Sequence, residues 1–249
     1  MRVGLIGAGN MARAMARGWG EPVLCTDHGS GRAAALAAEL GGEAPASNAE
    51  LAESADVVVL CHKPAQLEQV AREIQGVSTV VSVLGGVSFS ALRAAYPSAG
   101  LVRAMPNTPV EVRQGVICWA QDELDADLAA ALRDRFRVLG AVIELPEPLL
   151  DLATGLSGVG PAYLAVVAEA MSDSAIKHGL PPALATELVS LTLAGTAALL
   201  RAREGDTLAI RREVASPGGV TVRGLAALER AGLRAAFLDA ADALASHRP

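Results

Sequence analysis

The sequence predicts an α/β protein in which a doubly wound, mostly parallel sheet is followed by an all-helical domain. Three observations lead to this prediction. Short apolar runs alternate with helical stretches in the first half, a glycine-rich turn follows the first run, and strand-like runs vanish from about Glu147 onward. With 249 residues and a hydrophobic fraction of 51%, the chain can fill the cores of two modest domains.

Four apolar runs in the first half are expected to be strands, at residues 2–7, 22–26, 56–61 and 79–84. They show no polar alternation, which is typical of strands covered by helices on both faces. Helices are expected after the first two runs, at 11–19 and 31–40. Strand and helix alternating at this spacing predict a parallel, doubly wound sheet.

The turn after the first strand reads GxGxxA over Gly7–Ala12. Gly7 allows the chain to turn tightly, Gly9 lets the backbone approach a pyrophosphate, and Ala12 is small enough for the helix to pack on the strand. Amides at the helix start, at Asn10 and Met11, then face a diphosphate with the helix dipole behind them. The turn predicts a dinucleotide site in a Rossmann-type domain.

The end of the second strand leaves the choice of dinucleotide open. Asp27 stands where an acid would bind a ribose 2′-hydroxyl, as in NADH, whereas Ser30 and Arg32 would suit the 2′-phosphate of NADPH. An equally good interpretation is that Asp27 is only a turn residue and Ser30 only a helix cap. Lys63, in a loop at the carboxyl edge of the sheet, is either a ligand or a solvated charge.

The second half is Ala/Leu-rich, with helices expected at 161–178, 182–202, 221–231 and 233–245. Two prolines near residue 147 mark the expected boundary between a dinucleotide-binding domain, 1–146, and a helical substrate and dimerisation domain, 147–249. Apolar residues on several helix faces exceed what one small bundle can bury. We therefore expect a homodimer, which could assemble further into an oligomer of dimers.

Composition argues against several partners. The net charge of −6 disfavours nucleic acid. The longest apolar run, 188–200, contains four Ser, Thr or Gly residues and falls short of the ~20 residues of a membrane span. Three dispersed cysteines and no export-signal pattern predict a cytoplasmic protein, and no metal site is expected.

Two small-residue segments, 154–163 and 214–221, are expected to be loops that enter helices. Backbone N–H groups in such a loop can form an anion-binding nest for a substrate carboxylate. The alternative is an ordinary turn with a helix cap at Ser216 or Thr221.

Several motifs resemble those of the pyrroline-5-carboxylate reductase family over nearly the whole chain. The matching segments are GAGNMA at 7–12, Lys63-Pro64, RAMPNTP at 103–109, TGLSGVGPAY at 154–163 and SPGGVT at 216–221. The resemblance implies a Rossmann-type domain, a helical dimerisation domain, and NAD(P)H-dependent reduction of L-1-pyrroline-5-carboxylate to L-proline, the last step of proline biosynthesis.

The resemblance also implies site residues. The cofactor is expected at the glycine turn, after the second strand, at Asn48 and at the loop that contains His62, Lys63 and Pro64. Asn48 could instead be only a helix N-cap. The substrate carboxylate is expected on the amides of Gly218, Gly219, Val220 and Thr221, with Glu204 as a substrate-facing acid. Val159 and His62 depart from the family pattern and could alter substrate fit or cofactor preference.

Carbonyl reduction requires a Lys, His or Tyr acid, whereas a protonated cyclic imine needs hydride alignment and a carboxylate anchor. The loops of the helical half contain neither Lys nor His, so we expect imine reduction, with Thr221 hydrogen-bonding the ring nitrogen. A β-hydroxyacid dehydrogenase is disfavoured because Leu164 stands at the position of that family's catalytic lysine. A related imine reductase and a non-catalytic nucleotide-binding module remain as alternatives.

Overall fold

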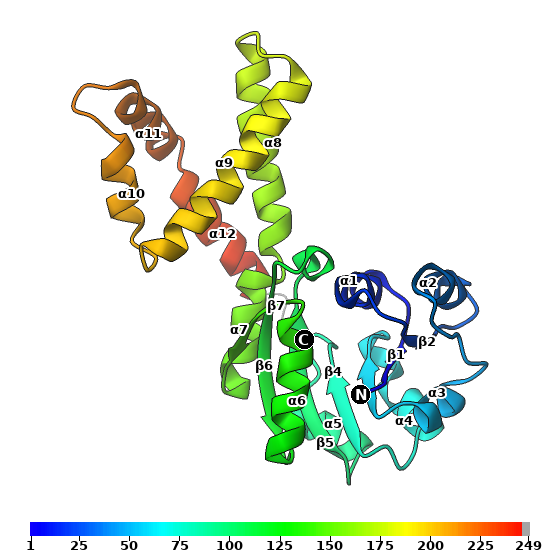
Figure 1. Ribbon diagram of the computed structural model, residues 1–249. Coiled ribbons are helices and arrows are strands. Elements are labelled where there is room, and N and C mark those ends of the chain that lie inside the picture. Colours follow the sequence, from blue (N-terminus) through cyan, green and yellow to red (C-terminus); the bar gives the residue numbers. More distant parts are fainter. Residues whose placement is uncertain (246–249) are drawn as a thin grey trace. The chain divides into compact units, whose positions relative to one another are not determined.

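The computed structural model describes residues 1–245 and divides into two compact units, one up to Pro161 and one from Ala162 onward. Figure 1 shows the first unit as a sheet with flanking helices, in blue to green, and the second as helices alone, in lime to red. The α/β class expected from the sequence, a mostly parallel Rossmann-type sheet followed by helices, is confirmed.

The first unit contains one seven-stranded sheet with the order β2-β1-β3-β4-β5-β6-β7. Strands β1 to β5 are parallel, β6 runs antiparallel to β5, and β7 is parallel to β6. The chain leaves β1 toward β2 and then returns to place β3 on the other side of β1. This reversal is the topological switch point, where doubly wound sheets bind ligands outside their carboxyl ends. The strands are β1 (Val3–Ile6), β2 (Leu24–Thr26), β3 (Val57–Leu60), β4 (Thr79–Ser82), β5 (Gly100–Pro106), β6 (Gly115–Asp122) and β7 (Gly140–Glu144).

Seven α-helices accompany the sheet, and short 3₁₀ turns lie at Pro64–Gln66 and Thr108–Val112. The four strands and two helices predicted in this half are present with ends shifted by two residues at most. The helices are α1 (Asn10–Trp19), α2 (Arg32–Leu40), α3 (Asn48–Ser54), α4 (Leu67–Glu73), α5 (Phe89–Ala95), α6 (Ala126–Arg137) and α7 (Glu147–Ser157).

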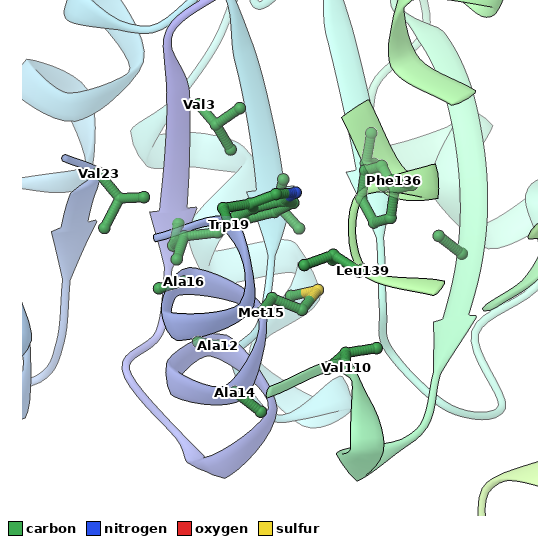
Figure 2. Close-up of a cluster of buried hydrophobic side chains, with 14 of the residues drawn as sticks. Val3, Ala12, Ala14, Met15, Ala16, Trp19, Val23, Val110, Phe136 and Leu139 are labelled. Carbon is green, nitrogen blue, oxygen red and sulfur yellow. The ribbon is translucent and has the colours of Figure 1, made fainter. Parts of the chain in front are cut away.

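The largest core cluster lies between the sheet, α1 and α6. Figure 2 shows Met15 and Trp19 of α1 facing Phe136 and Leu139. The Trp19 and Phe136 rings meet edge to face, 5.6 Å apart, and the Trp19 indole N–H donates to the Arg135 carbonyl at 3.0 Å. Helix α1 is therefore firmly seated on the sheet, which fixes the glycine turn that begins it.

Helix α7 corrects the loop expected over 154–163. The helix continues through Ser157, and α8 begins at Gly160, so only two residues separate the helices. The segment is helical because Leu150 is fully buried against a cluster from β5 and β6, which holds α7 to the sheet. A carboxylate nest over residues 154–157 is therefore excluded, because these backbone N–H groups belong to the interior of a helix.

A buried arginine strengthens this attachment. Arg103 of β5 is 1% exposed and donates to Glu147 and Asp151 of α7, both at 2.8 Å. Glu147 also accepts from the backbone N–H of Phe89 at 2.6 Å. These bonds explain why α7 packs with the first unit, although the sequence placed a boundary before it.

The second unit consists of helices only, and its predicted helices are confirmed to within one residue at each end. Among the described residues 162–245, only Ser172, Ala185 and Val189 are buried. The helices are α8 (Gly160–Lys177), α9 (Pro182–Ala202), α10 (Thr207–Val214), α11 (Val220–Arg230) and α12 (Leu233–Ala245). Residues 246–249 lie outside the described part of the chain.

Two stretches, 147–177 and 182–202, are long and apolar enough to cross a membrane by length and composition alone. Their mean hydropathies are 1.3 and 1.6, and little of either is buried. The apolar run 188–200 is only part of α9, which has 21 residues. The length of the apolar run therefore does not by itself exclude a membrane.

Candidate functional site

A cleft of about 500 Å³ lies at the carboxyl ends of β1, β2 and β3, at the topological switch point. Ten of the twelve expected cofactor residues line it. The lining is Ile6, Gly7, Ala8, Gly9, Asn10, Met11, Thr26, Asp27, His28, Ser30, Arg32, Asn48, Cys61, His62, Lys63 and Gln66.

The two glycines of the first turn meet different surroundings. Gly7 has φ of +106°, and a Cβ there would lie 2.7 Å from the carbonyl carbon and oxygen of Cys61. A Cβ on Gly9 would meet no protein atom within 4 Å. Gly7 is thus required by the fold itself, whereas the space beside Gly9 is open for a ligand.

Helix α1 begins directly at this space. Its N-cap residue is Gly9, and no side chain caps the helix. The first-turn N–H groups, including those of Asn10 and Met11, therefore lack a side-chain partner and can bind a diphosphate. Ala12 does not line the cleft but is fully buried beneath it, where a small side chain lets α1 approach the sheet.

Asp27 is occupied by its own loop. Its carboxylate accepts from the backbone N–H groups of Gly29, Ser30 and Ala33 at 2.8, 3.1 and 2.9 Å, and from the Ser30 hydroxyl at 2.7 Å. The bond from Ala33, joined by those from Ser30 and Gly29, lowers the pKa of Asp27 to about 2. Asp27 therefore acts as a turn residue, as one of the two interpretations expected. The hydrogen-bond acceptor sites of its carboxylate are largely filled by its own loop.

Ser30 and Arg32 remain at the rim of the cleft. Ser30 is not the helix cap, because the N-cap residue of α2 is Gly31. Arg32 and Lys63 are exposed, and neither has an ion-pair partner within 4 Å in the described part of the chain. Two unpaired cations beside an open cleft favour a phosphorylated ligand.

Asn48 is not the N-cap of α3, since Ser47 takes that position and accepts from Glu50. The Asn48 side chain accepts from the Thr26 hydroxyl and donates to Glu73 at 2.6 Å. This network joins the end of β2 to α3 and α4. It holds Asn48 in the wall of the cleft.

His62 follows β3 and is 8% exposed. Its Nδ1 lies 2.8 Å from the carbonyl oxygen of Lys63, which makes Nδ1 the donor and Nε2 unprotonated in the neutral ring. Burial lowers the pKa of His62, so the ring is neutral at physiological pH. Pro64 begins the 3₁₀ turn behind Lys63 and does not line the cleft. Gln66, which the sequence analysis missed, does line it, and its side chain accepts from the Lys63 N–H at 3.1 Å.

The second predicted anion site lies in the helical unit, where the SPGG segment enters α11. Gly219 is the N-cap of α11, and neither Ser216 nor Thr221 caps the helix. A Cβ on Gly219 would lie 2.5 Å from the Ser216 hydroxyl oxygen, so glycine keeps this turn compact. The first-turn amides, including those of Val220 and Thr221, have no side-chain partner. They remain available to a carboxylate.

Glu204 lies shortly before α10 in the chain, whereas Gly218 lies shortly after α10. The assignment of Glu204 as a substrate-facing acid stays a prediction. Over residues 1–245, no group of three or more His, Cys, Asp or Glu could hold a metal ion.

The curated pyrroline-5-carboxylate reductase of Synechocystis sp. is 39% identical over 197 residues, which cover 78% of this chain and 74% of that protein. The chain belongs to the pyrroline-5-carboxylate reductase family. Residues 147–248 match the family model for pyrroline-5-carboxylate reductase dimerisation, and residues 2–86 match the model for coenzyme F420-dependent NADP oxidoreductase. The glycine turn and the SPGG turn thus lie in segments that match two different models.

Solved structures extend the likeness to the whole chain. The 1-pyrroline-5-carboxylate reductase of Streptococcus pyogenes has a TM-score of 0.90 at 28% identity, over 98% of this chain and 96% of that chain. The Plasmodium falciparum pyrroline carboxylate reductase, solved with NADP bound, has a TM-score of 0.86 at 26% identity, over 100% and 97%. The similarity to solved pyrroline-5-carboxylate reductases therefore covers both the sheet unit and the helical unit.

Proposed function

We propose that this protein reduces L-1-pyrroline-5-carboxylate to L-proline with a reduced nicotinamide dinucleotide, as the last step of proline biosynthesis. The observation that carries the proposal is the pairing of two anion sites in a member of this family. One is the glycine-turn cleft of the sheet unit, and the other is the uncapped start of α11.

The cleft fits a dinucleotide. The open space beside Gly9 admits a diphosphate to the first-turn amides of α1, and Asn10 and Met11 border it. Lys63, His62 and Asn48 also line the cleft. A bound reduced nicotinamide supplies the hydride for the reaction.

We further propose that NADPH is preferred over NADH. The Asp27 carboxylate already accepts four hydrogen bonds, so it offers little to a ribose 2′-hydroxyl. Arg32 carries an unpaired charge at the rim, where it can bind a 2′-phosphate together with Ser30. Arg32→Met should raise the KM for NADPH roughly 10-fold and leave that for NADH nearly unchanged.

In the helical unit, the amides of Gly218 to Thr221 bind the substrate carboxylate and orient the ring. The Thr221 hydroxyl accepts a hydrogen bond from the protonated ring nitrogen, which keeps the imine in its iminium form. Addition of a hydride to C5 of the iminium gives the neutral secondary amine of the product. No general acid is needed, because the nitrogen already carries its proton.

The exposed helices of the second unit are covered by a second copy of the chain in this proposal. On α9, Leu184, Leu188, Leu191 and Leu199 share one exposed face. The neighbouring helix α8 carries Glu169 and Asp173, and a carboxylate at a bilayer centre costs about 2.5–3.5 kcal/mol. A protein partner therefore fits better than lipid. We propose a cytoplasmic homodimer in which residues 1–146 bind the dinucleotide and residues 147–249 bind the imino acid and dimerise.

The direct test is to mix purified protein with pyrroline-5-carboxylate and NADPH or NADH. We expect loss of the absorbance of the reduced nicotinamide with stoichiometric formation of proline, faster with NADPH. Reduction of other cyclic imines at a higher kcat/KM would favour the related imine reductase. Cofactor binding without turnover of any imine would favour the non-catalytic module.

A further inference from the structure

Asn10 is the first residue of α1, and it borders the cleft assigned to the dinucleotide. Its side-chain oxygen accepts a hydrogen bond from Nη2 of Arg13, one turn further along the helix, at 2.9 Å. No other hydrogen bond to the Asn10 side chain is formed within residues 1–245.

The chemistry of arginine fixes the orientation of this amide. A guanidinium has donors only, so the face of Asn10 turned toward Arg13 must be its oxygen. The NH₂ group is then the free end of the side chain, beside the uncapped amides of α1. With the amide turned over, an oxygen would stand next to the phosphates, where a lone pair repels the anion.

Arg13 also differs from Arg17, the other arginine of α1, in how its charge is paired. Arg17, on the next turn of α1, donates to Glu39 at 2.7 Å and to Glu111 at 3.0 Å. Arg13 has no carboxylate within 4 Å in the described part of the chain, and its Nε is buried without a hydrogen-bond partner. A half-buried cation that is left unpaired costs stability, and within residues 1–245 the one side-chain hydrogen bond of Arg13 is to Asn10, a residue of the cleft.

We propose that Arg13 is a positioning residue for the dinucleotide: it orients the Asn10 amide so that the NH₂ group donates to a diphosphate oxygen. The inference rests on the cofactor cleft of the proposed function. Arg13 itself does not touch the dinucleotide in this account, and acts through Asn10.

A double-mutant cycle on NADPH binding tests this coupling, with the dissociation constant measured by titration of nicotinamide fluorescence. Arg13→Met should raise the dissociation constant roughly 5- to 10-fold in the wild-type background. In the Asn10→Ala background the same change should raise it less than about twofold, because no amide is left to orient. An equal loss in both backgrounds would overturn the proposal and indicate direct contact of Arg13 with the phosphates. No loss in the wild-type background would overturn it as well.

The matched control is Arg17→Met, which removes the same charge from the same helix without touching Asn10. It should change the dissociation constant less than about twofold in either background. Arg13→Lys should restore part of the affinity, because an ammonium also donates to the amide oxygen. The KM for the imino acid should stay the same in every variant. If wild-type protein bound no NADPH, the proposed function would fail, whereas binding without coupling would refute only the role of Arg13.

Discussion

The two compact units of this chain differ in how far their apolar residues are buried. In the sheet unit, the strands and α1 bury theirs in continuous clusters, and all residues that line the proposed cofactor cleft belong to that unit. In the helical unit, three residues of the described 162–245 are buried, and leucines stand exposed along α9. The sheet unit can therefore build its site alone, whereas the helical unit requires a further surface to cover its helices.

The largest expected effect comes from placing a charge on the exposed face of α9. Leu188→Glu would bury a carboxylate in the proposed dimer contact and should convert the dimer to monomer, with activity reduced roughly 100-fold or more. NADPH binding should persist, because the sheet unit is unaffected. Sedimentation and a turnover assay measure both properties. Thr186→Glu adds the same charge on another face of the same turn and should leave the dimer intact. A monomeric wild-type enzyme with full activity would show that the helical unit needs no further surface to cover its helices.

The next effect separates binding from chemistry at the start of α11. Thr221→Val removes the hydroxyl that we propose accepts from the ring nitrogen, and kcat should fall roughly 100-fold. Thr221→Ser keeps the hydroxyl and should retain most of the activity. Steady-state kinetics at saturating NADPH distinguish the two variants. Equal kcat values for the valine and serine variants would remove this role from Thr221.

A matched pair in the first turn sharpens the distinction between fold and ligand. Gly7→Ala forces a Cβ against the Cys61 carbonyl at positive φ and should lower the free energy of unfolding by about 3 kcal/mol. Gly9→Ala meets only open space and should change it by less than about 0.5 kcal/mol, while weakening NADPH binding roughly 10-fold. Urea denaturation and NADPH titration give the two quantities. Similar destabilisation by both substitutions would contradict this account of the turn.

The smallest effect concerns the loop that Asp27 organises. Asp27→Asn weakens the bonds to the N–H groups of this loop and should cost about 1 kcal/mol at neutral pH. Because the folded-state pKa of about 2 lies below the unfolded value, this stabilisation is complete above pH of about 4 and is lost as pH falls toward 2. The difference in stability between wild type and variant should therefore shrink over that window. A difference that stays constant down to pH 2 would show that the carboxylate charge is not involved.

Within the sheet unit, some elements could be predicted from the sequence and others could not. Continuous apolar runs made β1 to β4 predictable, whereas β5 was missed because Arg103 interrupts its apolar pattern. That arginine is nevertheless buried, since carboxylates from α7 pair with it. The small residues 154–157 suggested a loop, but they extend a helix that Leu150 anchors to the sheet.

The candidate site shows a similar limit. Spacing alone located the glycine turn and the SPGG turn, because both depend on local backbone geometry. It could not reveal that the Asp27 carboxylate accepts its hydrogen bonds from its own loop. These bonds depend on where the side chain lies in space, which no motif encodes.

The central claim is that a nicotinamide held by the sheet unit reduces an imino acid held at the start of α11. Incubation with pyrroline-5-carboxylate and NADPH that carries deuterium at the transferable position tests it most directly. Mass spectrometry should find proline with one deuterium, at C5, and the Thr221→Val variant should form it far more slowly. Proline without deuterium, or consumption of the dinucleotide without any proline, would contradict the account.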